Sequence, residues 1–548
     1  MWSHLAEPAC CLQKLAVELA DQPYFPSIRS RPTSKGARRS VSVHWPSLSA
    51  ERRIRDLDAL ASGERVDLLV VGGGITGAGI ALDAASRGLS VALVERDDLA
   101  SGTSAYSSRV VHGGTRYLAT RGLGLAVESA TERAHLMKRI APHLVRTFPM
   151  LLPEYADTSR RTKALSRLGL FAGDLVRLGT GTGRQTLPGT RKVSNAEASA
   201  LFPAIQRDGL GGGLLSFDAQ LEDDARLVIT VARTAAAYGA KILPRVRALR
   251  VDGDGADVVC ELTGDRMRVT AGAVVNATGA WAGELEPSIR LGTRRGTHLL
   301  VRSDALGDPR CALAVSVDGD PSHVVFAIPQ SDGLTLIGTT DVDAQSPNDG
   351  APSLEEANFL LDALNPALGT AIGCDDIVGR FAGVRPVLPE DEDSDLSRRE
   401  AMVVSESGVI TIVGGKLTTY RKMAQDVVDK VVGSRMLWAG ECLTATLPLV
   451  GAAAPERLAA MSEPVRLVRR YGAEAPRIAD LITERPELGE RVVPELPTIR
   501  AELAFAMQHE LAITAGDLVD RRTRIGLTRY RDQALEVAAR IVDMHHAR

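Results

Sequence analysis

The chain lacks several features by which large classes of protein are recognised. No apolar run in it approaches the roughly 20 residues that a bilayer-spanning helix needs. Its six cysteines include no CxxC pair, which argues against a structural zinc site and a disulfide framework and fits a reducing cytoplasm. A net charge of −3 gives no global case for nucleic-acid binding.

Residues 1–47 differ in composition from the rest of the chain. Arginine, serine and proline are frequent there, and no apolar segment resembles the core of a secretory signal. Acidic residues count against a transit peptide. We expect a disordered extension, or the product of a start codon placed too far upstream. The whole chain of 548 residues is too long for one core, so two or three domains are expected.

Residues 66–95 place a strand, a glycine turn, a helix and a second strand in succession. Leu68–Val71 form a short apolar run suited to a buried parallel strand. Gly72, Gly74 and Gly77 then give the GxGxxG spacing. The first glycine permits the tight turn, the second lets a pyrophosphate approach the backbone, and the third lets helix and strand pack closely. The helix N-terminus faces that pyrophosphate with free N–H groups.

A carboxylate ends the second strand of this unit. Glu95 stands where it accepts hydrogen bonds from an adenosine ribose, and Gly88 is placed to cap the intervening helix. A lone GxGxxG is weak evidence, because a glycine-rich turn gives the same letters. Here both strands, the helix and the acid are in register, so the sequence predicts a dinucleotide site.

Two further segments favour FAD over NAD as the dinucleotide. Residues 273–281 form a buried strand followed by a turn of small residues at Gly279, and residues 408–420 run from a strand through Gly414-Gly415 into a helix. A helix N-terminus at the N1/C2 edge of a flavin stabilises the anion that forms on reduction. The sequence contains no second GxGxxG unit, so we expect no separate NAD(P)H domain. Electrons then enter from a substrate bound beside the flavin.

These motifs, with others in the same order, resemble the family of FAD-dependent glycerol-3-phosphate dehydrogenases of the respiratory, aerobic type. The resemblance runs from about Leu48 to the C-terminus and does not include residues 1–47. It rests on the segments Gly72–Gly77, Thr103–Ser108, His112–Leu118, Asp223–Leu227, Arg295–His298, Ile337–Asp341, Gly383–Pro386 and Gly414–Thr419.

The resemblance implies a fold of α/β and α+β class. It has a FAD-binding Rossmann-like domain of the glycine/D-amino-acid oxidase type, an antiparallel-sheet substrate domain and a helical C-terminal cap. We expect a discontinuous FAD-binding domain (62–110, 205–285 and 395–430), a substrate domain (111–204 and 286–394) and a helical domain (440–548). Alternating runs at Ser322–Pro329 and Leu334–Gly338 suit antiparallel strands, and residues 456–470 and 499–517 have helical periodicity.

The resemblance also implies which residues contact the cofactor. The loop after the second strand is rich in hydroxyls, which can reach phosphate and ribitol oxygens; a solvated loop is the plainer alternative. No segment resembles a covalent flavin attachment site, so non-covalent FAD is expected. The expected contacts are Gly72, Gly74, Gly77, Glu95, Thr103, Ser104, Ser108, His112, Gly279, Gly415, Leu417 and Thr418.

Oxidation of a secondary alcohol requires loss of the hydroxyl proton and transfer of the C2 hydride to flavin N5, and a phosphate substrate requires cations. By resemblance, Arg116 and Tyr117 line the substrate site, while Arg385 and Lys416 lie near the flavin and the substrate. The plainer alternatives are an ion pair for Arg116 and a surface lysine for Lys416. Arg385 has two roles open to it: binding phosphate, or stabilising the developing alkoxide.

His298 is our first choice for the general base, because an imidazole titrates near neutral pH and can accept the hydroxyl proton. Arg385 is its rival for activating the hydroxyl, and an isolated histidine is more often structural. We expect His298, Arg385 and Lys416 to be catalytic and to touch the substrate. Residues 339–341 lie at a strand end, where they either shape the pocket or form a β-turn.

The family delivers electrons to quinone, which implies a cytoplasmic protein bound peripherally to the inner face of the cytoplasmic membrane. Residues 160–178 combine basic side chains with apolar ones at helical spacing, as in a surface helix that touches anionic lipid. An ordinary amphipathic helix packed on its own domain has the same pattern. The expected partners are sn-glycerol 3-phosphate, a membrane quinone and the membrane surface, with no nucleic acid and no metal; a homodimer is left open.

The leading interpretation is oxidation of sn-glycerol 3-phosphate to dihydroxyacetone phosphate, with electrons passed through FAD to a quinone. A glycerol-3-phosphate oxidase that uses oxygen shares this domain plan. An amine or amino-acid oxidase of the same fold explains the FAD motifs, but not the cationic set of Arg116, Arg385 and Lys416. A flavin-binding protein without turnover is disfavoured, because no motif position is disabled.

Overall fold

The computed structural model describes residues 47–114, 123–317, 320–388 and 400–547. The chain divides at residue 46, and Pro46–Arg548 forms the compact second unit. The expected disordered extension lies, apart from Ser47, outside the described residues, and the second unit alone is considered below. Its first helix, α2 (Ala50–Ala61), follows the N-cap Ser49, whose hydroxyl accepts a hydrogen bond from the N–H of Arg52 at 3.3 Å.

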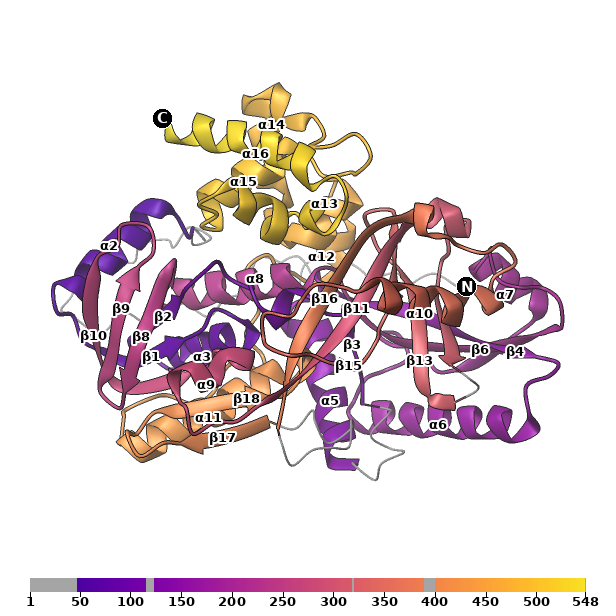
Figure 1. Cartoon of the computed structure of the whole chain (residues 1–548), viewed down its shortest axis with the longest axis horizontal. Coiled ribbons are helices and arrows are strands. Elements are labelled where there is room, and N and C mark those ends of the chain that lie inside the picture. Colours follow the sequence, from indigo (N-terminus) through magenta and orange to yellow (C-terminus); the bar gives the residue numbers. More distant parts are fainter. Residues whose placement is uncertain (1–46, 115–122, 318–319, 389–399, 548) are drawn as a thin grey trace, which may run out of the picture. The chain divides into compact units, whose positions relative to one another are not determined.

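An eight-stranded sheet carries the glycine-rich motif (Figure 1). Its inner strands are parallel, and one edge strand is antiparallel. In spatial order they are β17 (Glu400–Val404), β18 (Ile410–Gly414), β10 (Arg266–Asn276), β1 (Val66–Val71), β2 (Val91–Glu95) and β7 (Lys241–Pro244). The antiparallel strands β8 (Val246–Asp252) and β9 (Gly255–Cys260) continue from the first half of β10.

Helices α3 (Ile75–Ser86), α8 (Asp224–Ala237) and α11 (Tyr420–Arg435) share one hydrophobic core with the parallel strands. Leu68 and Val70 of β1 are fully buried in this core, while Leu69 is equally buried in a second core with residues of α2 and β9. Burial on both faces is what an apolar parallel strand requires. The helix α3 ends as expected, with Gly88 just beyond it at φ +89°.

A ten-stranded sheet forms the second layer system. Its strands pair in antiparallel fashion except for β4 and β12, which are parallel, so the expected antiparallel sheet is present with one parallel pairing. The predicted alternating runs are β13 and β14, which pair antiparallel. The strand order is β15 (Val342–Asp343), β11 (Gly292–Arg302), β14 (Leu334–Gly338), β13 (Asp320–Pro329), β12 (Ala312–Val317), β4 (Val145–Tyr155), β6 (Leu210–Leu221) and β3 (Val110–Val111). Two more strands pair beside this path, β16 (Ile377–Val387) with β11 and β5 (Arg191–Val193) with β6.

Strand β6 differs from our division of the chain, which assigned residues 205–285 to the FAD-binding domain. It pairs with β4 from Val145↔Leu221 to Tyr155↔Leu210 and therefore lies in the ten-stranded sheet. The helix α8 that follows packs against α3. A buried strand has the same composition in either sheet, so its sequence does not reveal its partner. We propose that residues 205–223 belong with the substrate domain.

Short helices form the C-terminal region, at the top of Figure 1. They are α12 (Pro455–Ala459), α13 (Val465–Tyr471), α14 (Ala475–Glu484), α15 (Arg500–His509) and α16 (Arg531–His546). The helical periodicity expected over 456–470 and 499–517 corresponds to helices in the structure, but each stretch is interrupted. Pro464 separates α12 from α13, because proline cannot continue a helix hydrogen-bond ladder. The helix α15 stops at His509, shortly before Leu511 turns to φ +52°.

Buried ion pairs join these helices to α8. Both terminal nitrogens of Arg233 donate to Glu474, at 2.6 and 2.9 Å, and Arg470 donates to Asp223 at 2.6 Å. Removing one partner of such a pair leaves an uncompensated buried charge, which is strongly destabilising. The C-terminal helices are therefore fixed to the helix that borders the nucleotide-binding sheet.

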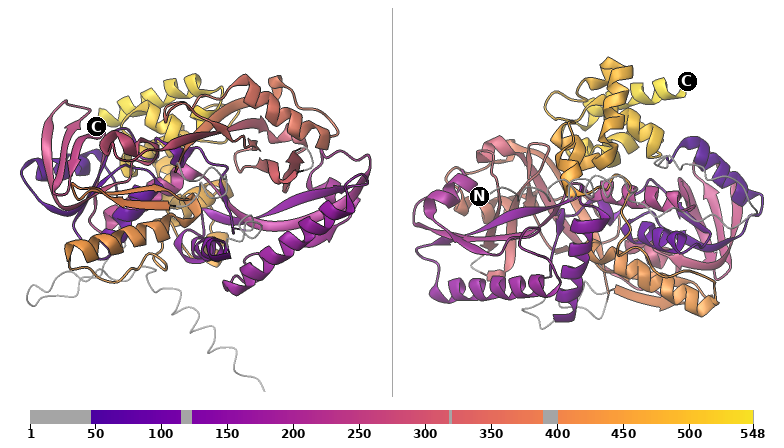
Figure 2. Two further views of the ribbon diagram at one scale, coloured as in Figure 1. Left: turned by 60° about the horizontal axis from the view of Figure 1, so that its bottom comes forward. Right: turned by 180° about the vertical axis from the view of Figure 1, so that it is seen from behind.

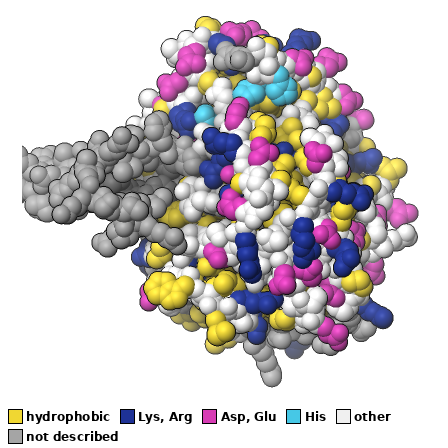
Figure 3. Space-filling model, turned by 90° about the vertical axis from the view of Figure 1, so that its left-hand side faces the viewer, with side chains coloured by type: hydrophobic (Ala, Val, Ile, Leu, Met, Phe, Trp, Pro, Cys, Tyr) yellow, Lys and Arg dark blue, Asp and Glu magenta, His cyan; other side chains and the backbone are white. Residues whose placement is uncertain are grey.

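The molecular surface is mixed in character. Figure 3 shows basic and acidic side chains interspersed on the side that carries α2 and β9, in keeping with the small net charge. Within the described ranges, no helix is long and apolar enough to cross a membrane.

Candidate functional site

The glycine-rich turn between β1 and α3 is built by close backbone contacts. Gly72 has φ +115°, and a Cβ there would lie 2.5 Å from the carbonyl oxygen of Ala277 on the neighbouring strand. A Cβ at Gly77 would lie 1.9 Å from the carbonyl oxygen of Gly72. Gly74 is the N-cap of α3 and offers no side-chain acceptor to the helix. Apart from the N–H of Ile75, which donates to Ser104, the first N–H groups of α3 have no cap from the side chain of the N-cap residue and suit an anion at this turn.

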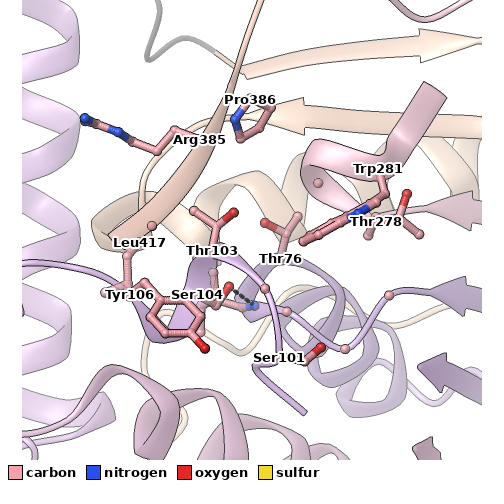
Figure 4. A pocket seen from close by; sticks show the side chains of 18 of the residues that line it. Thr76, Ser101, Thr103, Ser104, Tyr106, Thr278, Trp281, Arg385, Pro386 and Leu417 are labelled. Carbon is pink, nitrogen blue, oxygen red and sulfur yellow. Dashed lines mark hydrogen bonds between the residues drawn. The ribbon is translucent and has the colours of Figure 1, made fainter. Parts of the chain in front are cut away.

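The carboxylate of Glu95 closes the same turn. It accepts hydrogen bonds from the N–H of Gly73 at 2.6 Å and of Asp97 at 2.9 Å. Burial raises the pKa of Glu95, and these two N–H groups oppose the rise. Ser104 accepts a hydrogen bond from the N–H of Ile75 at 3.0 Å, which holds the hydroxyl-rich loop against the start of α3 (Figure 4).

One cavity of about 980 Å³ collects most of the predicted site residues. Its size is at the upper end of the roughly 300–1,000 Å³ typical of small-molecule sites, as an extended dinucleotide requires. Figure 4 looks into it, with Arg385 and Pro386 on the opposite side from Ser104. The predicted residues that line it are Gly72, Gly74, Glu95, Thr103, Ser104, Ser108, His112, Gly279, His298, Arg385, Gly415, Lys416, Leu417 and Thr418. Gly77 does not line the cavity and packs against Gly72 instead.

The turns after β10 and β18 approach this cavity from the eight-stranded sheet. Gly279, Gly414 and Gly415 all have positive φ, at 60°, 79° and 79°, a backbone conformation that residues other than glycine rarely adopt. Thr418 lies in the short 3₁₀ turn that leads into α11. The two predicted strand–turn–helix units therefore meet at the cavity, beside the loop that carries Thr103.

His298 lies on β11, with only 3% of its surface exposed. Its ring stacks on Phe381 at 5.0 Å, and its Nε2 lies 2.8 Å from the hydroxyl of Ser108. Burial, together with the positive charges of Arg385 and Arg109, lowers the pKa of His298 to about 3. The imidazole is therefore neutral at physiological pH and retains a lone pair for a proton.

Arg385 lies directly opposite Arg294 in the β11–β16 register. Both donate to the same carboxylate oxygen of Asp341, from Arg385 Nη2 at 3.1 Å and from Arg294 Nε at 2.9 Å. All three residues line the cavity, and Asp341 is about one-third exposed. This shared acceptor fixes the direction of two guanidinium groups beside His298.

Two further predicted residues line the cavity in different settings. Lys416 extends towards α5 (Leu123–His135), where its ammonium lies 3.3 Å from the hydroxyl of Ser129. His112 is half exposed, and its Nδ1 lies 3.2 Å from Asp218. Arg133 also donates to Asp218, at 2.6 Å. Arg116 and Tyr117 lie outside the described residues.

The structure adds cavity residues that sequence analysis did not select. Arg294 stands beside the quoted Arg295–His298 segment, and its charge was the available signal. The C-terminal segment contributes Thr514, Gly516, Asp517, Asp520 and Arg521. No motif marks these residues, because only the docking of the C-terminal helices brings them to the cavity.

The two ends of the cavity suit different chemistry. One end offers helix N–H groups and a buried carboxylate for a dinucleotide, and the other offers a neutral imidazole beside cationic side chains for an anionic alcohol. This combination defines the class as FAD-dependent oxidoreductases. Family comparison agrees: residues 67–421 match the model described as FAD dependent oxidoreductase, and residues 442–548 match the C-terminal domain of alpha-glycerophosphate oxidase.

Individual relatives narrow the class. Glycerol-3-phosphate dehydrogenase 1 of Mycobacterium tuberculosis is 47% identical over 508 residues, which cover 90% of this chain and 98% of the relative. The mitochondrial glycerol-3-phosphate dehydrogenase of Mesocricetus auratus is 34% identical, covering 92% of this chain and 74% of the relative. The crystal structure of the Bacillus halodurans enzyme complexed with FAD superimposes with a TM-score of 0.69 at 28% identity, covering 90% of this chain and 94% of the other.

The chain belongs to the FAD-dependent glycerol-3-phosphate dehydrogenase family. The resemblance drawn from the sequence motifs is thereby confirmed, together with the fold class and FAD as the cofactor. The residues that line the cavity fit that cofactor, since the glycine turn, Glu95 and the turns at Gly279 and Gly415 meet there.

Proposed function

We propose that this chain oxidises sn-glycerol 3-phosphate to dihydroxyacetone phosphate and that the electrons pass to a quinone. The observation that carries the proposal is that Arg294, Arg385 and Lys416 line the same cavity as the neutral His298, whose pKa is lowered in part by Arg385. A dianionic phosphate ester needs several cations, and its hydroxyl needs a proton acceptor. FAD, when bound, supplies the acceptor for the C2 hydride at N5.

The cofactor contacts that we propose follow the cavity from one sheet to the other. The N-terminus of α3 and its glycines hold the pyrophosphate, and Glu95 accepts from a ribose hydroxyl. The positive end of the 3₁₀ turn at Leu417–Thr418 lies towards the flavin. We propose non-covalent binding through Gly72, Gly74, Gly77, Glu95, Thr103, Ser104, Ser108, His112, Gly279, Gly415, Leu417 and Thr418.

Arg385 is proposed to bind the phosphate or the developing alkoxide of the substrate. Asp341 orients its guanidinium, so the planar fork needs little reorganisation when the anion arrives. Lys416 adds a point charge from the flavin side of the cavity. Arg116 and Tyr117 stay predictions as further substrate contacts.

His298 is proposed to take the hydroxyl proton. Its Nε2 already accepts or donates a hydrogen bond with Ser108, which also lines the cavity, so Ser108 is positioned to orient the ring or to pass the proton. The anionic substrate neutralises the arginine charges that lower the pKa of His298. Substrate binding therefore makes the imidazole a better base at the moment of reaction.

The electron acceptor is testable with purified holoenzyme. We expect sn-glycerol 3-phosphate to reduce a soluble short-chain quinone, with one dihydroxyacetone phosphate formed per quinone and no hydrogen peroxide. Rapid peroxide formation in air without quinone would instead establish the oxygen-using oxidase. Oxidation of glycine or a D-amino acid in place of glycerol 3-phosphate would overturn the substrate class.

We further propose that the protein works at the inner face of the cytoplasmic membrane and that α6 (Arg160–Gly179) makes the contact. Helix α6 lies along the lower edge of Figure 1 and beside purple strands in Figure 2. A helix packed by its apolar face would bury that face. Here its large apolar side chains are about half exposed or more: Leu165 61%, Leu168 64%, Phe171 60%, Leu175 55% and Leu178 49%. Such an apolar stripe suits insertion at a lipid interface.

The basic side chains of α6 divide between two settings. Arg177 is buried and donates to Asp174 and to the carbonyl of Thr182, so it is not available to lipid, contrary to our expectation. Arg161 is exposed, and Arg167 is partly exposed and pairs with Glu154. We therefore expect the apolar stripe to contribute more to binding than charge.

Flotation of the holoenzyme with anionic liposomes tests this proposal. The wild type is expected to co-migrate, and the double variant Leu168→Ser/Phe171→Ser is expected to lose most of that binding. Leu354→Ser is the matched control, because Leu354 is a leucine 67% exposed on α10 (Leu354–Leu364) and away from α6. Equal binding by the double variant would exclude the α6 stripe as the lipid contact.

A further inference from the structure

The C-terminal helical region reaches the FAD cavity at its nucleotide end. Thr514, Gly516 and Arg521 line the same cavity as Glu95 at the end of β2. Arg245 and Arg247, which follow β7, line that end as well. The cofactor contacts proposed above lie in the glycine-rich unit, in the segment that follows β2 and in the turns after β10 and β18. The C-terminal segment is therefore an additional wall of the site without an assigned role.

This segment is held firmly on both sides. One carboxylate oxygen of Asp517 accepts from the N–H groups of Ile513 and Thr514, each at 2.9 Å, and the other accepts from Arg245 at 2.5 Å. Arg522 is fully buried, and its guanidinium makes a two-pronged contact with Asp98 at 2.5 and 2.9 Å. The π-helical turn Asp517–Arg522 is thereby anchored to the segments that follow β2 and β7.

Arg521 differs from the arginines around it. Arg522 and Arg524 both have hydrogen-bond partners, whereas across the described ranges Arg521 has neither a hydrogen bond nor an ion pair, and its Nε is buried without a partner. A desolvated donor that is left unpaired costs free energy. That cost is tolerated when a ligand completes the site, and the ligand must offer acceptor oxygens or negative charge.

We propose that Arg521 binds the adenosine diphosphate half of FAD and that the C-terminal region thereby secures the cofactor. Phosphate and ribose oxygens of that half are the acceptors a guanidinium recognises. Arg521 lies with Glu95 and Arg245 beside the eight-stranded sheet, whereas His298 and Arg385 belong to the ten-stranded sheet. Its role is therefore in holding the nucleotide and not in the chemistry at the substrate.

The test measures retention of FAD by the holoenzyme and needs no turnover. FAD released on serial dilution is separated by ultrafiltration and quantified by fluorescence, which gives Kd. Arg521→Met is expected to raise Kd about tenfold, the loss of one charge-assisted contact. Arg521→Lys keeps the charge but not the planar fork, and its Kd for FAD is expected to lie between those of the wild type and Arg521→Met.

Competition identifies which half of FAD is contacted. Added ADP is expected to displace FAD from the wild type, and Arg521→Met should raise the Kd for ADP, obtained from competition, by the same factor as it raises the Kd for FAD. The Kd for FMN, which lacks the adenosine half, should be unchanged by the substitution. An equal loss for FMN would overturn the placement of Arg521 at the adenosine end.

A matched variant separates binding from folding. Arg531 follows in the same region and pairs with Asp520 at 2.9 Å, but it does not line the cavity. Arg531→Met should leave the Kd for FAD within about twofold of the wild type, and the cofactor-free proteins should unfold at the same temperature in Arg521→Met as in the wild type. A wild-type Kd in Arg521→Met, or the same rise in Arg531→Met, would refute the proposal.

Discussion

Replacing His298 by asparagine tests the proposed proton acceptor most sharply. Asparagine keeps a polar side chain at this buried position, but its amide ends near the place of Nδ1, so the contact between Nε2 and the Ser108 hydroxyl at 2.8 Å is lost together with the basic lone pair. Loss of a general base typically lowers the rate by about 10²–10⁴-fold, or roughly 3–5 kcal/mol of transition-state stabilisation. We expect His298→Asn to lower kcat by that factor while FAD remains bound.

The structure also predicts the pH profile of the wild type. Burial and two arginines lower the pKa of His298 from 6.5 to about 3, so at pH 7 only about one molecule in ten thousand carries the imidazolium. The profile of kcat/KM, which reports the free enzyme, should therefore show no essential ionisation of His298 between pH 5 and 8. The profile of kcat should show a higher pKa, because the phosphate neutralises nearby arginine charge in the complex.

The assay is steady-state turnover of purified holoenzyme from pH 5 to 9, with FAD content measured by absorbance. His509→Asn is the matched control, since burial and two arginines also lower the pKa of His509 to about 3, but it does not line the cavity. Its kcat should stay within about twofold of the wild type. The reasoning is refuted if His298→Asn keeps more than half of kcat, or if the wild-type kcat/KM requires a group of pKa 6–7 that the variant lacks.

Two other predictions follow from the charged groups of the molecule. Asp341→Asn removes the charge that orients Arg294 and Arg385, so kcat/KM for sn-glycerol 3-phosphate should fall about tenfold. Asp343→Asn serves as the comparison, because the carboxylate of Asp343 is 90% exposed and pairs with Arg294 at 3.2 Å, whereas that of Asp341 accepts from both Arg294 and Arg385; equal kinetics in the two variants would contradict the orienting role of Asp341. The second prediction concerns stability in acid. Below pH 6.5 the histidines of the unfolded chain are protonated, whereas the buried histidines of the folded state stay neutral. The unfolded state therefore binds more protons, and the free energy of unfolding should fall as pH drops from 6.5 towards 4. Urea unfolding at pH 7 and pH 5 measures this, and equal midpoints would contradict the lowered pKa values, about 3 each, of His143, His298 and His509.

The nucleotide-binding unit was predictable because the contacts that determine it are made by residues close together in the sequence or on one adjacent strand. Gly72 and Gly77 are required by contacts within a few residues or with one adjacent strand, and the apolar run at β1 needs only burial on both faces. Such patterns can be recognised from sequence because the residues that determine the local structure are close together along the chain.

The misjudged features depend on distant partners. The sheet that β6 joins is decided by its pairing with β4, which lies far from it in the sequence. Arg177 matched the basic face of an amphipathic helix, but its guanidinium turns inward to Asp174 and Thr182. Arg521 reaches the cavity only because the C-terminal helices dock against α8, and no local spacing encodes that.

The central claim is that this FAD site accepts electrons from sn-glycerol 3-phosphate, and an anaerobic absorbance titration tests it most directly. The account predicts that sn-glycerol 3-phosphate bleaches the flavin band of the holoenzyme, whereas glycine and D-alanine leave it unchanged. Bleaching by the amino acids alone would contradict the assignment of Arg385 and Lys416 to a phosphate ester. A flavin that none of the three compounds reduces would contradict the proposed reaction itself.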